Sequence, residues 1–162
     1  MTSSGTAKVT LPADNQILIT REFDAPRHLV WRAYTEPELI KRWWAGERGE
    51  VASVEVDLRV GGHWRYVMVA SPGFEVAFHG EYREIAAPER LVNTEAFEGI
   101  PDPDGNAALV TVTLTEKDGR TFLEALVEHK DQAGRDMHIN SGMESGMQGS
   151  YDNLERVAAS LA

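Results

Sequence analysis

The chain has 162 residues, a length that suits one domain with a single hydrophobic core. Its 26 acidic side chains outnumber 16 basic ones, and the net charge of −10 disfavours a nucleic-acid backbone or an anionic membrane as partner. Cysteine is absent, which excludes disulfides and thiolate sites, and no apolar run suits a signal peptide or membrane span, so we expect a cytoplasmic protein. Residues 1–15 are small and polar and predict a flexible tail before one domain, residues 16–162.

Two short helices are predicted after a first strand. In QILITREF, residues 16–23, Ile17 and Ile19 alternate with polar neighbours, which is typical of a half-buried strand. DAPRHLVWRAY, residues 24–34, follows with Asp24 in a position to cap a helix. TEPELIKRWW, residues 35–44, then restarts a helix with the Thr-x-x-Glu spacing of a capping box.

Apolar and polar residues alternate with a period of two from Val51 to His129. Six strands separated by short turns are expected there, and no helix intervenes that would allow parallel pairing. With the first strand they make a curved antiparallel sheet of seven strands. In RLVNTEAF, residues 90–97, the inward phase stays open because Leu91 and Val92 are both apolar.

The longest predicted helix ends the chain and starts at Ser141, after a loop over residues 130–140. Met143 and Met147 open its apolar stripe. Glycines stand at positions 142, 146 and 149, although a glycine in a helix interior costs about 1 kcal/mol relative to alanine. Two explanations remain open: the glycines keep volume free for a ligand, or they permit close packing of the helix on the sheet.

Four stretches of the chain resemble a known superfamily in their order and spacing. They are REFDAPRHLVWRAYTEPELIKRWW, VEVDLRVGGHWRYVM, FHGEYREIAAPERLV and GMQGSYDNLERVAASLA. Together they resemble the START-like, Bet v 1-like (SRPBCC) superfamily, and within it the homologues of the activator of heat-shock protein 90 ATPase. The resemblance implies an α+β helix-grip fold, in which the curved sheet wraps around the C-terminal helix. It also implies an elongated cavity between sheet and helix, used by relatives for apolar ligands, polyketide cyclisation or partner binding.

Three functions are compatible with such a fold. We favour a small-molecule binding protein that holds an apolar or aromatic ligand in the cavity, because binding needs no placed acid–base groups. The first alternative is a chaperone-interacting domain resembling the heat-shock protein 90 ATPase activator, although the predicted outer sheet face is rich in Arg, Glu and Thr. The second alternative is an enzyme of the polyketide cyclase or aromatase type.

The expected cavity lining is mainly aromatic. Trp43 and Trp44 point about 100° apart on a helix, so one should face the core and the other the cavity mouth. A tyrosine hydroxyl buried on an apolar face needs a polar partner, which a ligand would supply. The full expected ligand-binding set is Trp43, Trp44, Trp64, Tyr66, Met68, Phe78, Tyr82, Phe97, Met143, Met147 and Tyr151.

Glu95 is the one catalytic candidate. If its strand points it inward beside Tyr66 or Tyr82, burial would raise its pKa and suit it to proton transfer. In the opposite phase it is a solvent-facing glutamate. His63 and His79 fall in the outer-face phase, and the histidines form no converging set, so we expect no metal and no cofactor.

Overall fold

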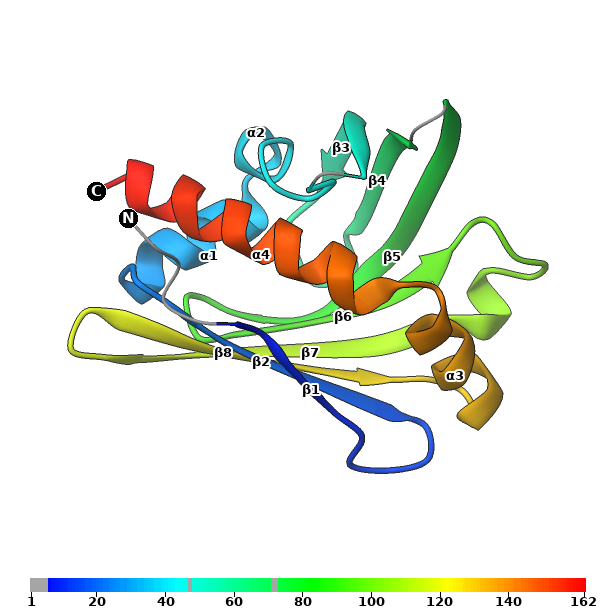
Figure 1. Cartoon of the computed structure of the whole chain (residues 1–162). Helices are drawn as coiled ribbons and strands as arrows, with labels where there is room; N and C mark the ends of the chain where they lie inside the picture. The colour runs from blue at the N-terminus through cyan, green and yellow to red at the C-terminus, as the bar shows by residue number, and fades with distance from the viewer. Residues whose placement is uncertain (1–5, 47, 71–72) are drawn as a thin grey trace.

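The computed structural model describes residues 6–46, 48–70 and 73–162, and it shows an antiparallel sheet curved around a long C-terminal helix (Figure 1). In chain order the elements are β1 (Lys8–Thr10), β2 (Gln16–Phe23), α1 (Arg27–Thr35), α2 (Pro37–Ile40), β3 (Gly49–Val56), β4 (His63–Ala70), β5 (Phe74–Ala86), β6 (Arg90–Phe97), the 3-10 turn η1 (Asp104–Asn106), β7 (Ala108–Lys117), β8 (Arg120–Glu128), α3 (Gln132–Asn140) and α4 (Met143–Ser160). This is the predicted α+β helix-grip architecture. Among the described residues, no helix combines the length and apolarity that crossing a bilayer requires.

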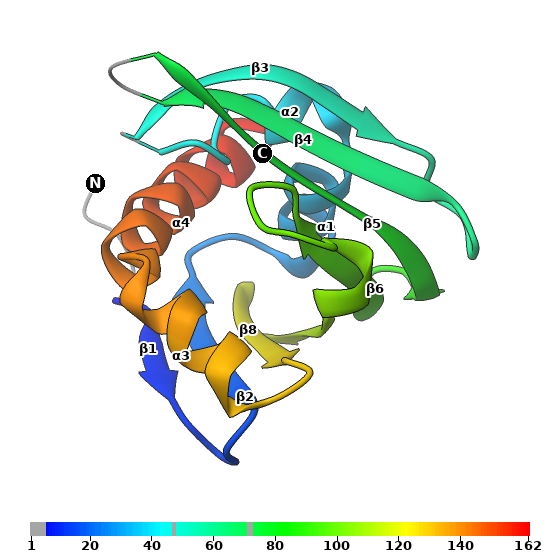
Figure 2. The same ribbon diagram turned by 90° about the vertical axis from the view of Figure 1, so that its right-hand side faces the viewer.

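The eight strands follow the order β1-β2-β8-β7-β6-β5-β4-β3. Strand β2 pairs with β8, so the first and last long strands are neighbours. Register shifts between Val51 and Ser53 in β3, and between Tyr82 and Glu84 in β5, mark bulges that increase local twist. Figure 2 shows the resulting curve, with β3 and β4 on one side of α4 and β1, β2 and β8 on the other.

The expected strand number and N-terminal tail need correction. The sheet has eight strands rather than seven, because Lys8–Thr10 pairs with β2 inside the segment predicted as a tail. Ala7 is buried, and its backbone N–H and C=O bond to the Gln148 side chain of α4 at 3.0 and 2.8 Å. These partners lie far along the chain, so local polarity gave no sign of them. Residues 1–5 lie outside the described residues.

Two helix starts also differ from expectation. The predicted loop over residues 130–140 contains α3, whose N-cap Asp131 accepts a hydrogen bond from the Gly134 N–H at 2.8 Å. The last helix begins at Met143 rather than Ser141, and Gly142 precedes it with a φ of 83°. Helix α1 is preceded by Pro26, without a side-chain cap from Asp24.

Helices α1 and α4 cover the concave face of the sheet and share one apolar core with it. The alternation predicted from sequence holds, since the buried positions of β2, β7 and β8 recur at every second residue. The main contributors are Ile17, Ile19, Phe23, Leu29, Val30, Val110, Val112, Leu123, Val127, Leu154 and Ala158.

Arg21 is the charged member of this inward row on β2. Its side chain is 0% exposed, and it forms ion pairs with Asp152 at 2.8 Å and Glu155 at 3.5 Å on α4. The guanidinium also lies 4.7 Å from the centre of the Phe23 ring. Glu155 in turn accepts a hydrogen bond from the Asp24 N–H at 2.8 Å. This network fixes the helix on the first long strand, and loss of the Arg21 guanidinium would remove the buried positive charge that both carboxylates share.

The three glycines of the last helix have separate explanations. Gly142 has the positive φ that disfavours other residues. A Cβ on Gly146 would come within 2.7 Å of the Arg48 guanidinium, so that glycine permits close approach of the loop before β3. A Cβ on Gly149 would meet open space. The packing explanation therefore accounts for Gly146.

Candidate functional site

The structure shows which side chains of β6 point to the concave face, a question that the sequence left open. Leu91 belongs to the core cluster, whereas Val92 is buried outside it. Asn93 pairs with Tyr82, and the Phe97 ring lies 5.0 Å from the Phe78 ring on β5. The alternation of these positions turns the Glu95 side chain toward the concave face, beneath α4.

Five aromatic rings run in contact across this face. Trp64 lies 4.7 Å from Tyr66, and Tyr66 lies 5.3 Å from Trp44, measured between ring centroids. Trp44 lies 5.8 Å from Phe78, which contacts Phe97. We call these five residues the ring chain. The Trp44 contacts are edge-to-face, a favourable geometry for aromatic pairs.

All four tyrosines of the chain interact with at least one other tyrosine, and three of them also with Glu95; we call the four the tyrosine cluster. They are Tyr34 on α1, Tyr66 on β4, Tyr82 on β5 and Tyr151 on α4. Burial raises the pKa of each of the four phenols, that of Tyr82 to about 12, and the charge of Glu95 further raises the pKa values of Tyr34, Tyr66 and Tyr151. Hydrogen bonding between the Tyr66 and Tyr82 side chains adds to the rise in the pKa of Tyr66 and opposes the rise in that of Tyr82.

Glu95 has an unusual electrostatic environment. Burial raises its pKa from 4.5 to about 7. Among the described residues, none forms a hydrogen bond or ion pair with its carboxylate. A carboxyl group with a pKa close to neutrality can donate or accept a proton, and as a carboxylate it can hold a cation.

The interior site keeps some contact with water. Glu95, Tyr34, Tyr66, Trp44 and Phe78 are only half-buried although they lie on the concave face beneath α4. Burial nevertheless dominates the pKa values of the ionisable members. These side chains are therefore partly accessible to water rather than sealed in the core.

Two open hollows lie elsewhere on the molecule. One of about 220 Å³ borders the loop between α2 and β3, and one of about 250 Å³ lies on the outer face of β3, β4 and β5. Each is bordered by a single aromatic residue of the predicted set, Trp43 in the first and Trp64 in the second, so the candidate site is the interior cluster.

The remaining predicted residues separate into core and site. Trp43 is buried, and its indole N–H donates to the Ala33 carbonyl at 2.8 Å, so Trp44 is the tryptophan of this pair that joins the ring chain. Met68 is buried outside the main core cluster. Met143 is a core residue, and Met147 is half-buried against the same core.

Tyr34 was missed by sequence reasoning. It lies four residues after the core residue Val30 on α1, a spacing that places two side chains on one helix face. Its ring also stacks on Trp43 with centroids 5.6 Å apart. The helical spacing was the available signal for its inward position.

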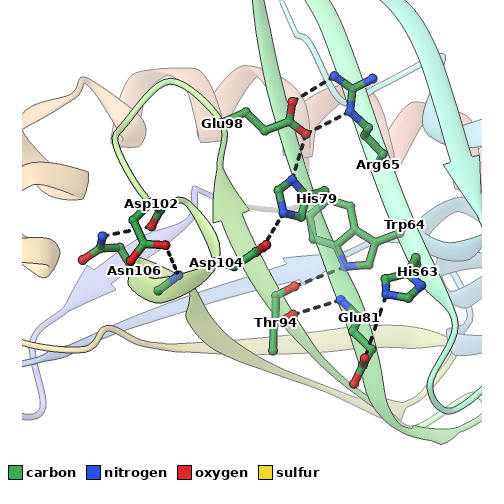
Figure 3. A network of polar contacts seen from close by, with 11 residues as sticks. His63, Trp64, Arg65, His79, Glu81, Thr94, Glu98, Asp102, Asp104 and Asn106 are labelled. Atoms are coloured by element: carbon green, nitrogen blue, oxygen red, sulfur yellow. Dashed lines mark hydrogen bonds and ion pairs between the residues drawn. The ribbon is translucent and has the colours of Figure 1, made fainter.

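A polar network occupies the outer face at the base of the β6–β7 loop (Figure 3). Glu98 accepts two hydrogen bonds from Arg65 at 2.9 Å and contacts His79 Nδ1 at 2.8 Å. His79 Nε2 contacts Asp104 at 2.5 Å. Hydrogen bonding by Arg65 lowers the pKa of Glu98 to about 2, and hydrogen bonding to Asp104 raises the pKa of His79. The network contains no nucleophile, and it ties the loop to the sheet.

Two histidines connect α3 to the end of β8. His129 Nε2 lies 2.9 Å from His138 Nδ1, and burial lowers both pKa values, that of His138 to about 4. Both rings are therefore neutral near pH 7, and one donates to the other. Over residues 6–46, 48–70 and 73–162, no group of three His, Asp or Glu side chains has the arrangement of a metal site.

Comparison with known proteins gives a consistent result. Residues 24–159 match the family model described as Activator of Hsp90 ATPase homolog 1-like protein. A protein from Rhodobacter sphaeroides has a similar crystal structure, with a TM-score of 0.85, 24% identity, and coverage of 95% of this chain and 99% of that one. A protein from Nitrosomonas europaea has a TM-score of 0.81 and 26% identity, over 93% of this chain and 97% of that one. No curated protein gave a significant match.

Proposed function

The chain belongs to the Activator of Hsp90 ATPase homolog 1-like family, and we propose that it binds a small apolar or aromatic molecule between the sheet and α4. The observation that carries this proposal is the partial exposure of Glu95 and of every ring-chain member except Trp64, on a concave face that a helix covers. In a face packed only for stability, these large side chains would be fully buried.

The composition of the site supports the same ligand class. Aromatic rings supply a flat apolar surface, and a small number of polar groups fix orientation, as in most small-molecule sites. Here the polar groups are the tyrosine cluster and Glu95. The ligand would enter beside Phe97, the ring-chain member that is 37% exposed.

Titration with N-phenyl-1-naphthylamine tests the proposal, because this neutral apolar dye fluoresces strongly only out of water. Phe78→Ala should weaken dye binding by about tenfold, since truncation removes a half-buried ring whose contact with the dye is worth about 1.4 kcal/mol. Phe122→Ala is the matched control, because Phe122 lies on the outer face of β8 and is 43% exposed. Equal binding curves for the two variants, or no saturable binding by the native protein, would rule the interior site out.

Chaperone interaction is a second candidate, and the family match is the observation that favours it. Its test is the ATP hydrolysis rate of purified Hsp90 with increasing amounts of this protein. A rate increase that saturates supports the interaction, and an unchanged rate at high protein concentration removes it.

Catalysis of the cyclase type would use the same interior site. The observation that favours it is the Glu95 pKa of about 7, which suits general acid–base work near neutral pH. Turnover of a polyketide chain by the native protein, lost in Glu95→Gln without loss of dye binding, would support this function. Equal turnover by both proteins would exclude Glu95 as the catalytic group.

A further inference from the structure

Glu95 differs from Arg21, a second charge in the interior, in having no counter-charge among the described residues. Arg21 is matched by Asp152 and Glu155 across the sheet–helix interface. For Glu95, no described residue supplies a cation or a hydrogen bond, and the position opposite it on β7 is Ala108. A carboxylate in such surroundings destabilises the folded protein unless something outside the chain pairs with it.

The groups around Glu95 favour a positive partner. Tyr34, Tyr66 and Tyr151 are phenols whose pKa values burial and the Glu95 charge raise, and these raised values keep them neutral at physiological pH. Neutral phenols cannot balance the charge of a carboxylate. Aromatic rings do attract cations, because the face of each ring carries a partial negative charge. The ring chain next to Glu95 therefore complements a cation with an apolar body.

The charge of the whole protein acts in the same direction. At −10 the chain concentrates cations near its surface and repels anions. An anionic ligand would meet both this field and the Glu95 carboxylate, whereas a protonated amine is attracted by both.

We propose that the ligand of the interior site is an organic amine with an aromatic or apolar body, whose ammonium group pairs with Glu95 while the body packs on the ring chain. This inference rests on the proposed function and narrows its ligand class. A neutral ligand that only accepts a hydrogen bond from protonated Glu95 is the competing possibility, and the test below separates the two.

Calorimetric titration with a matched pair of probes, phenethylamine and 2-phenylethanol, provides that test. At about pH 8, where Glu95 is mostly ionised, phenethylamine should bind at least about tenfold more tightly than the alcohol. Glu95→Gln should weaken phenethylamine binding by about tenfold or more and change 2-phenylethanol binding by less than about twofold. Glu124→Gln, the same substitution on the outer face of β8, should leave both affinities unchanged.

Each outcome has a distinct meaning. Equal affinity for the two probes, or phenethylamine binding that survives Glu95→Gln, would overturn the amine assignment. The interior binding site would still stand in that case if the native protein binds the neutral dye N-phenyl-1-naphthylamine. Absence of binding by all three probes would overturn the site and the amine assignment together. Because Gln removes an uncompensated charge, the variant should remain folded, and its far-ultraviolet circular dichroism verifies this.

Discussion

Replacing Glu95 by Gln should stabilise the protein at alkaline pH and change its stability little at acidic pH. Burial raises the Glu95 pKa in the folded protein, so the folded state keeps a proton that the unfolded chain loses as pH rises from 4.5 to about 7. The free energy of unfolding therefore falls as pH rises through this interval. The glutamine side chain has the same shape and no charge, so the variant lacks this decrease.

The pKa difference sets the size of the effect. A rise from 4.5 to about 7 corresponds to roughly 3 kcal/mol in the relative stability of the two protonation states. Water reaches part of the side chain and screens its charge, so we expect Glu95→Gln to raise the free energy of unfolding by about 1–3 kcal/mol at about pH 8. At about pH 5 the free energies of unfolding of the two proteins should agree within about 0.5 kcal/mol.

Urea unfolding of both proteins at a series of pH values measures this difference directly. The difference between native protein and variant isolates Glu95, because all other titrating groups are common to both. Glu124→Gln on the outer face should show no comparable pH-dependent gain. If Glu95→Gln lowered stability equally at both pH values, the carboxylate would have a favourable partner, and the reasoning on its environment would be wrong.

Three further predictions concern packing and the outer network. Arg21→Met removes the buried guanidinium that pairs with Asp152 and Glu155 on α4, and urea unfolding should show a loss of stability of about 3–5 kcal/mol; an unchanged midpoint would contradict a structural role for these ion pairs. Gly149→Ala should raise the stability by up to about 1 kcal/mol, because its Cβ meets open space. Gly142→Ala should lower the stability by about 1 kcal/mol, because the residue has a positive φ. Melting temperatures that shift in the same direction for both variants would refute this. Hydrogen bonding to Asp104 raises the pKa of His79. Protonated His79 therefore stabilises the folded protein fully below about pH 6.5, and this stabilisation is lost as the pH rises through the raised pKa. His79→Gln should therefore cost about 1 kcal/mol near pH 6 and less near pH 9, and an equal cost at both would contradict the assignment.

Local periodicity was enough to predict the strands and their faces. Strands β3 to β8 lie where alternation placed them, and Trp64, Tyr66 and Phe78 share the inner face because they share one phase. The phase of β6 was not available from sequence, since two adjacent apolar residues fit either direction. Pairing with β5 decides it, and pairing is a property of the whole sheet.

Features that depend on distant partners could not be predicted. Strand β1 has three residues and is held by β2 and Gln148 rather than by its own pattern. The outer network joins Arg65, His79 and Glu98 with a residue of the following loop, and nothing in their spacing marks that meeting. The individual members of the ring chain were named in advance, whereas the approach of Tyr34 and Tyr151 to Glu95 required the fold.

The pairing of β2 with β8 has a consequence for biosynthesis. Gln16 pairs with Glu128, and Phe23 pairs with Thr121, so β2 cannot join the sheet until most of the chain has left the ribosome. The helix that covers the concave face is made later still. During translation the hairpins of β3 to β7 must therefore exist for a time without their cover, and expression at lower temperature or with added folding chaperones should raise the soluble yield.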